Sequence, residues 1–170
     1  LNIFREVLQL IVTYIAGEAI IFHDEDEENQ VVKDSLEKYE ELLRRGRRQA
    51  LLRELGVLHN ILIMLNTLVP VTLCRQRAAT AQIQVNQTAY ATVEAIISDF
   101  LALILHLVDD NHDNQMVVAD NLLVILSHVT SDKKASAIVQ SMLRDNTVLQ
   151  ETKIGKHEIG TFAERMHDRE

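Results

Sequence analysis

The side chains best suited to chemistry in this sequence are histidines and aspartates that lie close together in one short stretch. That stretch is the one cluster in the sequence that resembles a set of metal ligands. A metal site also needs a fixed geometry and supporting outer hydrogen bonds, and loops at helix ends are commonly acidic without a metal. We therefore interpret the cluster as a solvated loop after a helix and expect no metal there. Its members are His106, Asp109, Asp110, His112 and Asp113.

Other potential catalytic or metal-binding residues lack the spacing that their chemistry needs. The acidic run 24–28 offers oxygen ligands, but it lacks the glycine and the spaced glutamate of a calcium-binding EF-hand loop. Cys74 is the one cysteine, and no base stands at a recognisable spacing from it. With five glycines in the chain, a glycine-rich loop that binds phosphate is not expected. The sequence therefore predicts neither an enzyme nor a bound cofactor.

A local excess of arginine is the strongest ligand-binding signal. Seven of the 17 Lys and Arg residues fall within positions 44–77, and none falls within positions 78–132. Clustered guanidinium groups suit a phosphate or an acidic protein surface. On this hypothesis the residual ligand-binding residues are Arg47, Arg48 and Arg53.

The overall charge favours a second interpretation of these arginines. The chain has 170 residues, a net charge of -8 and a sequence pI near 5.3. Such an acidic chain lacks the basic footprint of a nucleic-acid-binding protein. Glutamates on the same predicted helix stand at the spacing that favours helical ion pairs, so we favour internal pairing over ligand binding. The expected partners are Glu37, Glu40, Glu41 and Glu54.

The elements that position these residues are predicted to be helices joined by polar loops. The chain has 47% hydrophobic residues but only five glycines and one proline, so it has few of the residues that form the tight turns between β-strands. Helical periodicity predicts six to eight helices, with Gly17 and Pro70 as stops and Gly46 as a candidate interruption. Residues 23–30 are predicted to be a polar loop, and 70–87 are left undecided. The predicted helices cover about 2–16, 32–55, 57–69, 88–108, 114–129, 133–143 and 156–170.

Apolar stretches in these helices predict a soluble core. The two strongest, 57–69 and 96–108, are interrupted by polar residues and are shorter than the roughly 20 apolar residues of a membrane span. A single cysteine indicates a reducing compartment. Because the chain begins at Leu1 without a methionine, we expect it to be a domain excised from a larger protein.

The helix pattern favours a particular all-α architecture. Helices of about 12 to 20 residues alternate with short polar breaks in the second half, and stacked helical hairpins bury such helices against their neighbours. No strict repeat period is visible. We therefore predict an α-solenoid of the degenerate armadillo or HEAT type rather than a helical bundle.

Four segments carry a resemblance to a known family. Residues 47–58, RRQALLRELGVL, resemble the RIH domain that inositol trisphosphate receptors and ryanodine receptors share. The helix at 4–15 resembles the opening helix of that domain, and Asp110 with Asn114-Gln115 resembles its loop after a long helix. The tail, from 142–151 through Ile154 to 158–162, is similar to the end of the first such domain in inositol trisphosphate receptors.

This resemblance implies one RIH-like armadillo domain over residues 1–170. Its setting would be the cytosolic assembly of a tetrameric calcium-release channel in the endoplasmic reticulum membrane. Its partners would be neighbouring domains and other subunits, and the membrane would be reached only through the parent channel. In ligand-binding members the domain forms one wall of the inositol trisphosphate pocket, with a β-trefoil domain as the other wall.

The family's ligand-binding positions are poorly preserved in this sequence. Of its basic helix positions, Arg53 remains basic, while Ala50 and Gly46 replace the two earlier ones. The family's Tyr-Arg-Lys step falls on Asn111-His112-Asp113, where Asp113 would repel a phosphate. Arg47 and Arg48 would compensate only in part. We therefore expect that the domain does not bind inositol trisphosphate in the usual way.

Two functions remain open from the sequence. The favoured one is a structural and allosteric module of a divergent calcium-release channel, which acts through helix contacts rather than chemistry. The alternative is a free-standing armadillo-type adaptor that binds a protein or a peptide.

Overall fold

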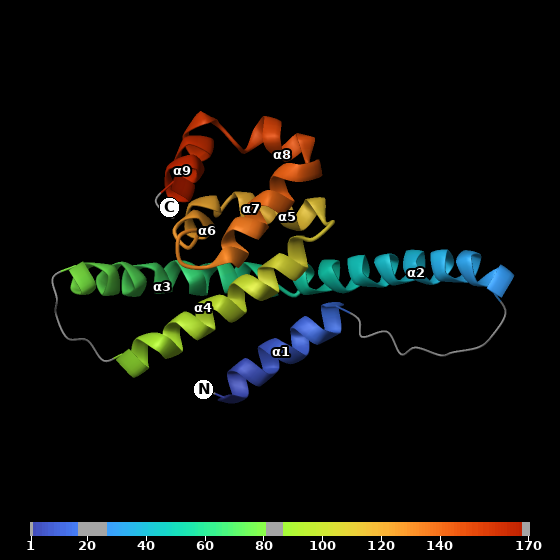
Figure 1. Ribbon diagram of the computed structural model, residues 1–170, viewed down its shortest axis with the longest axis horizontal. Coiled ribbons are helices and arrows are strands. Elements are labelled where there is room, and N and C mark those ends of the chain that lie inside the picture. Colours follow the sequence, from blue (N-terminus) through green and yellow to red (C-terminus); the bar gives the residue numbers. More distant parts are fainter. Residues whose placement is uncertain (1, 17–26, 81–86, 168–170) are drawn as a thin grey trace.

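The computed structural model describes residues 2–16, 27–80 and 87–167, and all regular structure in these ranges is helical (Figure 1). The all-α prediction is therefore confirmed for the described residues, with nine helices there in place of the expected six to eight. The stacking of helical hairpins into a solenoid stays a prediction. The helices are α1 (Asn2–Ala16), α2 (Glu27–Glu54), α3 (Val57–Thr80), α4 (Gln87–Val108), α5 (His112–Ala119), α6 (Leu122–Leu126), α7 (Lys133–Asp145), α8 (Thr147–Thr152) and α9 (Lys156–His167).

Helix α4 is the centre of the arrangement. It packs against α1, α3 and α7, so helices that are far apart in the sequence meet on its surface. Figure 1 shows α2 and α3 along the long axis, with α1 beside α4 on one side. The short helices α5–α9 gather on the other side, where α6 contacts both α7 and α9.

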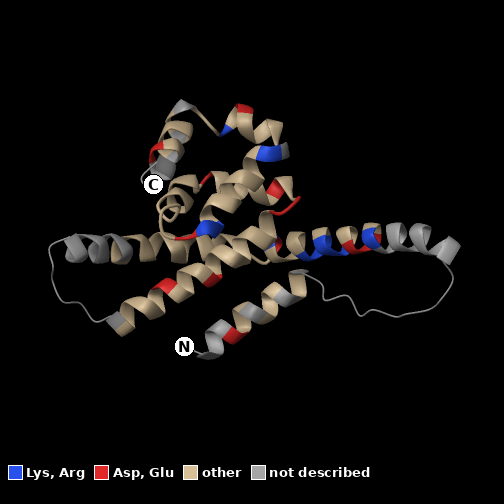
Figure 2. Cartoon of the chain, viewed as in Figure 1, with Lys and Arg blue, Asp and Glu red and all other residues tan. Residues whose placement is uncertain are grey.

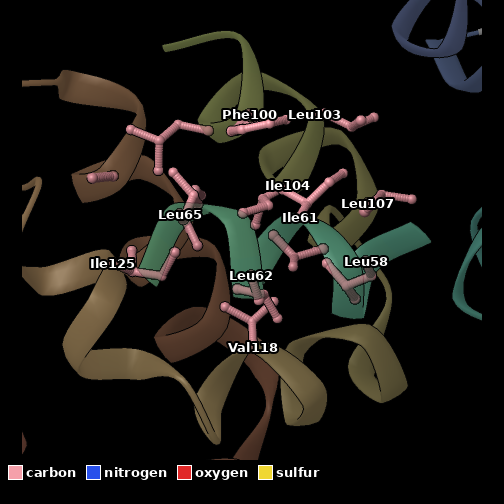
Figure 3. Close-up of a cluster of buried hydrophobic side chains, with 14 of the residues drawn as sticks. Leu58, Ile61, Leu62, Leu65, Phe100, Leu103, Ile104, Leu107, Val118 and Ile125 are labelled. Carbon is pink, nitrogen blue, oxygen red and sulfur yellow. The ribbon is translucent and has the colours of Figure 1, made fainter. Parts of the chain in front are cut away.

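The hydrophobic core lies where α3 crosses α4. The buried residues of α3 are Leu58, Ile61, Leu62 and Leu65, which recur at helical spacing and form one apolar stripe. Figure 3 shows this stripe facing the side chains of α4, with α5 and α6 closing the cluster from below. The residues that meet it there are Phe100, Leu103, Ile104, Leu107, Val118 and Ile125.

The break between α2 and α3 falls at Gly56, between the predicted helices 32–55 and 57–69. Helix α2 is continuous through Gly46, so the interruption expected there is wrong. Gly56 has a φ of 74°, a left-handed conformation that glycine adopts without strain and that commonly ends a helix. The axes of Lys38–Glu54 and Val57–Val71 differ by 62°. The bend turns α3 toward the core, while α2 packs against α1 and α5.

Pro70 does not end α3, which runs to Thr80. The predicted stop is therefore wrong, and most of the undecided segment up to Thr80 is helical. Proline removes one helical hydrogen bond, the one to the carbonyl four residues earlier. Pro70 and Asn66 are both exposed, so water is available at the position where that bond is missing.

Three other boundaries also differ from the sequence prediction. Helix α2 begins at Glu27, inside the stretch expected to be a polar loop, and residues 17–26 (with Gly17 and most of the acidic run) lie outside the described ranges. The single helix expected over 114–129 is two short helices, because Asp120 and Asn121 form a turn between α5 and α6. Helix α8 was not predicted. The start of α7 is confirmed, since the Asp132 carboxylate accepts from the Lys134 N–H at 2.8 Å.

Helix α4 is more apolar than the sequence analysis allowed. By length and composition, Thr88–Val108 could cross a membrane, with a mean hydropathy of 1.9. In its second half Leu101, Leu103, Ile104 and Leu107 are all buried. Contact with α1, α3 and α7 accounts for this apolarity, because a helix covered by other helices reads as apolar on most of its surface.

Candidate functional site

The three predicted ligand-binding arginines lie on α2 but do not converge on a common site. Figure 2 shows Lys and Arg concentrated on α2, with acidic residues where α4 leads into α5. Arg47 is exposed, whereas Arg48 and Arg53 are partly buried on the side of α2 that faces other helices. Both partly buried arginines are paired with other residues of the chain.

Arg48 connects α2 to the end of α1. Its guanidinium donates to the Ile15 carbonyl at 3.3 Å and forms an ion pair with Glu41. It also lies 5.6 Å from the centre of the Tyr14 ring, within the range of a cation–π interaction. With a side chain only 16% exposed, Arg48 is a structural contact between α1 and α2.

Arg53 connects α2 to α5. Its Nη1 lies 3.1 Å from the Asp113 carboxylate and donates to the Asn114 side-chain oxygen, also at 3.1 Å. Asp113 stands at a position where the resemblance expects a basic residue. Arg53 is the one basic helix position of the family that this sequence keeps, and its guanidinium is paired with a carboxylate of the same chain.

Arg45, which the sequence analysis did not select, makes the most complete pairing. One guanidinium nitrogen lies 2.8 Å from Asp109 and the other lies 2.7 Å from Asp110. Asp110 has a φ of 52°, an uncommon conformation for a residue other than glycine, and it turns the chain after α4. These carboxylates are about half exposed, so the ion pairs are worth only about 0.5–1 kcal/mol each.

Gln49 holds the end of α4 beneath these ion pairs. Its side chain is 1% exposed, and its Nε2 donates to the carbonyls of His106 at 2.7 Å and Asp109 at 3.0 Å. Its Oε1 accepts from Asn111 at 3.1 Å. A buried polar group costs about 1–3 kcal/mol when it loses its partner, so these buried bonds outweigh the exposed ion pairs.

Two further amides complete the connection between α4 and α5. Asn114 donates to the Leu107 carbonyl at 2.8 Å, and Gln115 donates to the Val108 carbonyl at 3.0 Å. Together with Gln49 and two backbone N–H groups, they satisfy all four carbonyls of the last turn of α4, Leu105 to Val108. Such carbonyls have no partner within their own helix. The end of α4 is therefore fully hydrogen-bonded inside the protein.

The network reaches α7 and α8 through Asn146. Its amide donates to the Gln115 side-chain oxygen at 2.9 Å and to the His112 carbonyl at 3.4 Å. Its oxygen accepts from the Leu149 N–H at 3.0 Å, which starts α8. We call the whole set the polar junction. It consists of Arg45, Gln49, Arg53, Asp109, Asp110, Asn111, Asp113, Asn114, Gln115 and Asn146.

The metal-ligand cluster of the sequence analysis falls at this junction but takes another role. Among the described residues no group of three or more His, Cys, Asp or Glu side chains could hold a metal ion. Asp109, Asp110 and Asp113 instead pair with arginines of α2. His112 is exposed at the start of α5.

Pairing on the same helix was predicted correctly for Glu40 and Glu41. Arg44 lies 2.8 Å from Glu40 and 3.9 Å from Glu41. The expected pairing of Glu54 is absent from the described contacts, and the side chain of Glu37 lies outside them. Arg75 and Arg77 are on α3, with side chains also outside the described set. The pairs of Arg45 with the turn after α4 and of Arg53 with α5 were not predicted, because residues 60 or more positions apart meet only in the fold.

Comparison with known proteins agrees with three of the four segments that carried the resemblance, while the helix at 4–15 lies almost wholly outside the matched range. The model of the RIH domain family matches residues 14–170, which is nearly the whole chain. Searches of curated proteins and of solved structures gave no match to this chain. The family segments noted in the sequence contribute Gln49, Arg53, Asp110, Asn114, Gln115 and Asn146, and the fold brings these residues together in the polar junction. The chain belongs to the RIH domain family of inositol trisphosphate and ryanodine receptors.

Proposed function

We propose that this chain is a structural and allosteric module of an intracellular calcium-release channel, in which the polar junction makes five helices move together. The family match supports a module of an inositol trisphosphate or ryanodine receptor type of channel. This match favours the channel module over the free-standing adaptor. On this proposal the domain lies on the cytosolic side of the endoplasmic reticulum membrane.

The observation that carries the proposal is the hydrogen bonding at the end of α4. Side chains from α2 and α5 hold carbonyls of α4, and Asn146 links α5 to the start of α8. A packed network of this kind has few ways to deform, because each lost bond would leave a buried polar group without a partner. A displacement of α2 is therefore expected to be passed on to α4 and α5 rather than absorbed at their contact.

The shape of the molecule suits such a role. Figure 1 shows the first half of α2 extending away from the other helices, while its second half carries the residues of the junction. A force applied to the extended part by a neighbouring domain would reach the junction along a continuous helix. We propose neighbouring domains and other subunits of a tetramer as the partners.

We further propose that the module does not bind inositol trisphosphate in the manner of ligand-binding members. Arg53 is paired with Asp113 and Asn114, and Arg48 is committed to Ile15 and Glu41. A phosphate group would have to displace these partners and approach a carboxylate of like charge, which is unfavourable at short range. Arg47 alone among the three predicted arginines has no partner within the described residues.

Titration calorimetry tests this part of the proposal. Inositol trisphosphate would be titrated into the chain linked to the adjoining β-trefoil domain that the family resemblance predicts in the parent protein. The expected result is no measurable binding at micromolar concentration, with a ligand-binding family member prepared in the same way as the positive control. Micromolar or tighter binding by the present chain would overturn it.

The finer architecture is also a proposal. We propose one armadillo-like domain over residues 1–170, with α1, α4 and α7 side by side as the helices of a stack. The support is that α4 packs on both α1 and α7, although these helices are far apart in the sequence. The single hydrophobic core cluster, which has members in α1, α2, α3, α4, α5, α6, α7 and α8, also favours one domain.

A further inference from the structure

The outward face of α2 between residues 47 and 54 has features of an unoccupied contact surface. Arg47, Leu51 and Glu54 are all exposed, and Leu51 remains 45% exposed although it is apolar. Helical geometry of about 100° per residue places these three on the side opposite Gln49 and Leu52, which are buried. This face is therefore directed away from the core of the molecule.

Both charged residues of this face lack a partner within the described part of the chain. Arg47 and Glu54 make no ion pair or hydrogen bond with the residues that the structure describes. The four other arginines of α2, by contrast, are all paired. Those four are Arg44, Arg45, Arg48 and Arg53. Among the arginines of α2, Arg47 is thus the one without such a partner, and it shares its exposed face with Glu54.

The spacing of the face suits contact with another helix. Arg47 and Glu54 are seven residues apart, which corresponds to two turns and about 10.5 Å along the axis. Between them lie Ala50, whose small side chain permits close approach, and the exposed Leu51. An apolar centre with one charge at each end is found in helix pairs whose apolar contacts are flanked by salt bridges between the helices.

We propose that this face binds the same face of a second copy of the chain, with the two α2 helices antiparallel around a two-fold axis between Ala50 and Leu51. In this arrangement Arg47 of each copy lies opposite Glu54 of the other, and the two Leu51 side chains meet near the centre. A two-fold contact of this kind uses one patch twice, so the patch must complement itself.

Charge order is the reason for choosing a second copy as the occupant. Arg47 stands toward the beginning of the helix and Glu54 toward its end, so an antiparallel copy places opposite charges together at both ends. A parallel copy would place like charges together and would be repelled. Two exposed leucines, Leu43 and Leu55, lie at the edges of the patch and add apolar surface on either side. The inference rests on this face alone and is independent of the proposed function.

Sedimentation equilibrium of the whole chain tests the proposal by measuring the dissociation constant of the dimer. We expect a dimer of micromolar or weaker affinity, since two-turn helix faces make a small interface. Arg47→Glu and Glu54→Arg should each weaken it at least roughly tenfold, because each creates two like-charge contacts. The double variant, which exchanges the two charges, should return to within roughly threefold of the unchanged protein.

Two further variants test whether a weaker dimer results from the loss of this contact rather than from a change in net charge or from unfolding. Lys38→Glu makes the same charge change as Arg47→Glu at an exposed position on the opposite side of α2, and it should leave the dimer unchanged. Leu51→Glu should abolish the dimer without unfolding the chain, as circular dichroism can verify. A monomer at millimolar concentration would overturn the proposal and leave the face to another partner. A dimer that Arg47→Glu or Leu51→Glu does not weaken, or that the double variant does not restore, would overturn it as well.

Discussion

At the scale of single residues, this protein uses buried amides more than exposed charges. The ion pairs of Arg45 and Arg53 are the charged contacts of the polar junction, yet their acidic partners are about half exposed or more. The amides of Gln49, Asn114 and Gln115 are almost fully buried and donate to backbone carbonyls at the end of α4. Because an unsatisfied buried group costs more than an exposed ion pair contributes, these amides determine how α2, α4 and α5 fit together.

His128 gives the fold a predicted dependence on pH. The side chain is 1% exposed, and burial lowers the pKa of the imidazole below its usual value of 6.5, with Asp132 opposing the shift. Its Nε2 has no hydrogen-bond partner among the described residues. An imidazole whose pKa is lower in the folded state binds protons more readily when the chain unfolds. The free energy of unfolding should therefore fall as the pH drops below about 6.5, with a slope of at most about 1.4 kcal/mol per pH unit from this residue.

Urea unfolding at pH 7.5 and 5.5 measures this effect, with His128→Leu as the comparison. Leucine has no proton to bind and fills a similar volume, so the variant should lose less stability between the two pH values than the unchanged chain. Carboxylates that titrate in both proteins cancel in the difference. Parallel losses in the two proteins would show that His128 does not titrate in this range.

At the scale of elements, α3 is a helix that contains a local defect and still forms. Its buried stripe, with Leu58, Leu62 and Leu65, packs into the core upstream of Pro70. Tertiary packing stabilises a helix far more than intrinsic propensity does, so the missing hydrogen bond is tolerated where the helix is exposed. Pro70 therefore does not set the end of α3, which lies ten residues further along the chain at Thr80.

Pro70→Ala should stabilise the protein. Alanine restores an N–H donor to the helix, and proline in a helix interior is less favourable than alanine by up to about 3 kcal/mol. Because Pro70 is exposed, no packing is lost. Thermal or urea unfolding should show a gain of about 1–3 kcal/mol. Asn66→Ala, an exposed substitution one turn earlier, serves as the control and should change stability by no more than about 0.5 kcal/mol. A loss of stability in Pro70→Ala would mean that the proline fixes a bend that the fold requires.

At the scale of the whole molecule, the polar junction joins the two sides of the fold. Helices α1 and α2 lie on one side of the end of α4, and α5, α7 and α8 lie on the other. The hydrophobic core near Leu62 and Phe100 supplies much of the stabilisation but has little directional preference. Hydrogen bonds have defined geometry, so the junction sets the relative orientation of the helices that the core holds together.

Gln49→Leu tests this role by removing hydrogen bonds without removing volume. The carbonyls of His106 and Asp109 would lose their amide partner, and unfolding should become easier by about 2–3 kcal/mol. Amide hydrogen exchange should also rise more in α5 and at the end of α4 than in α6. Gln140→Leu, at an exposed position of α7, is the matched control and should do neither. An equal rise in all helices would indicate a loss of stability without the predicted coupling.

The sequence by itself determined the helical class, the existence of most helices, the start of the helix at residue 133 and the family. These depend on local periodicity, side-chain capping and short motifs, which can be read without knowing what lies across the fold. It also placed Arg47, Arg48 and Arg53 on one helix and indicated correctly that glutamates of that helix pair with arginine.

Only the tertiary structure decided what those residues do. Arg48 turns toward Ile15, Arg53 toward Asp113, and Arg47 away from both, because neighbouring positions on a helix point about 100° apart. Gln49 appears in the sequence as one more polar residue, and its importance arises from burial against carbonyls nearly 60 positions away. Long-range hydrogen bonds have no local signature, so the motif that identified the family became a physical site only when the chain folded.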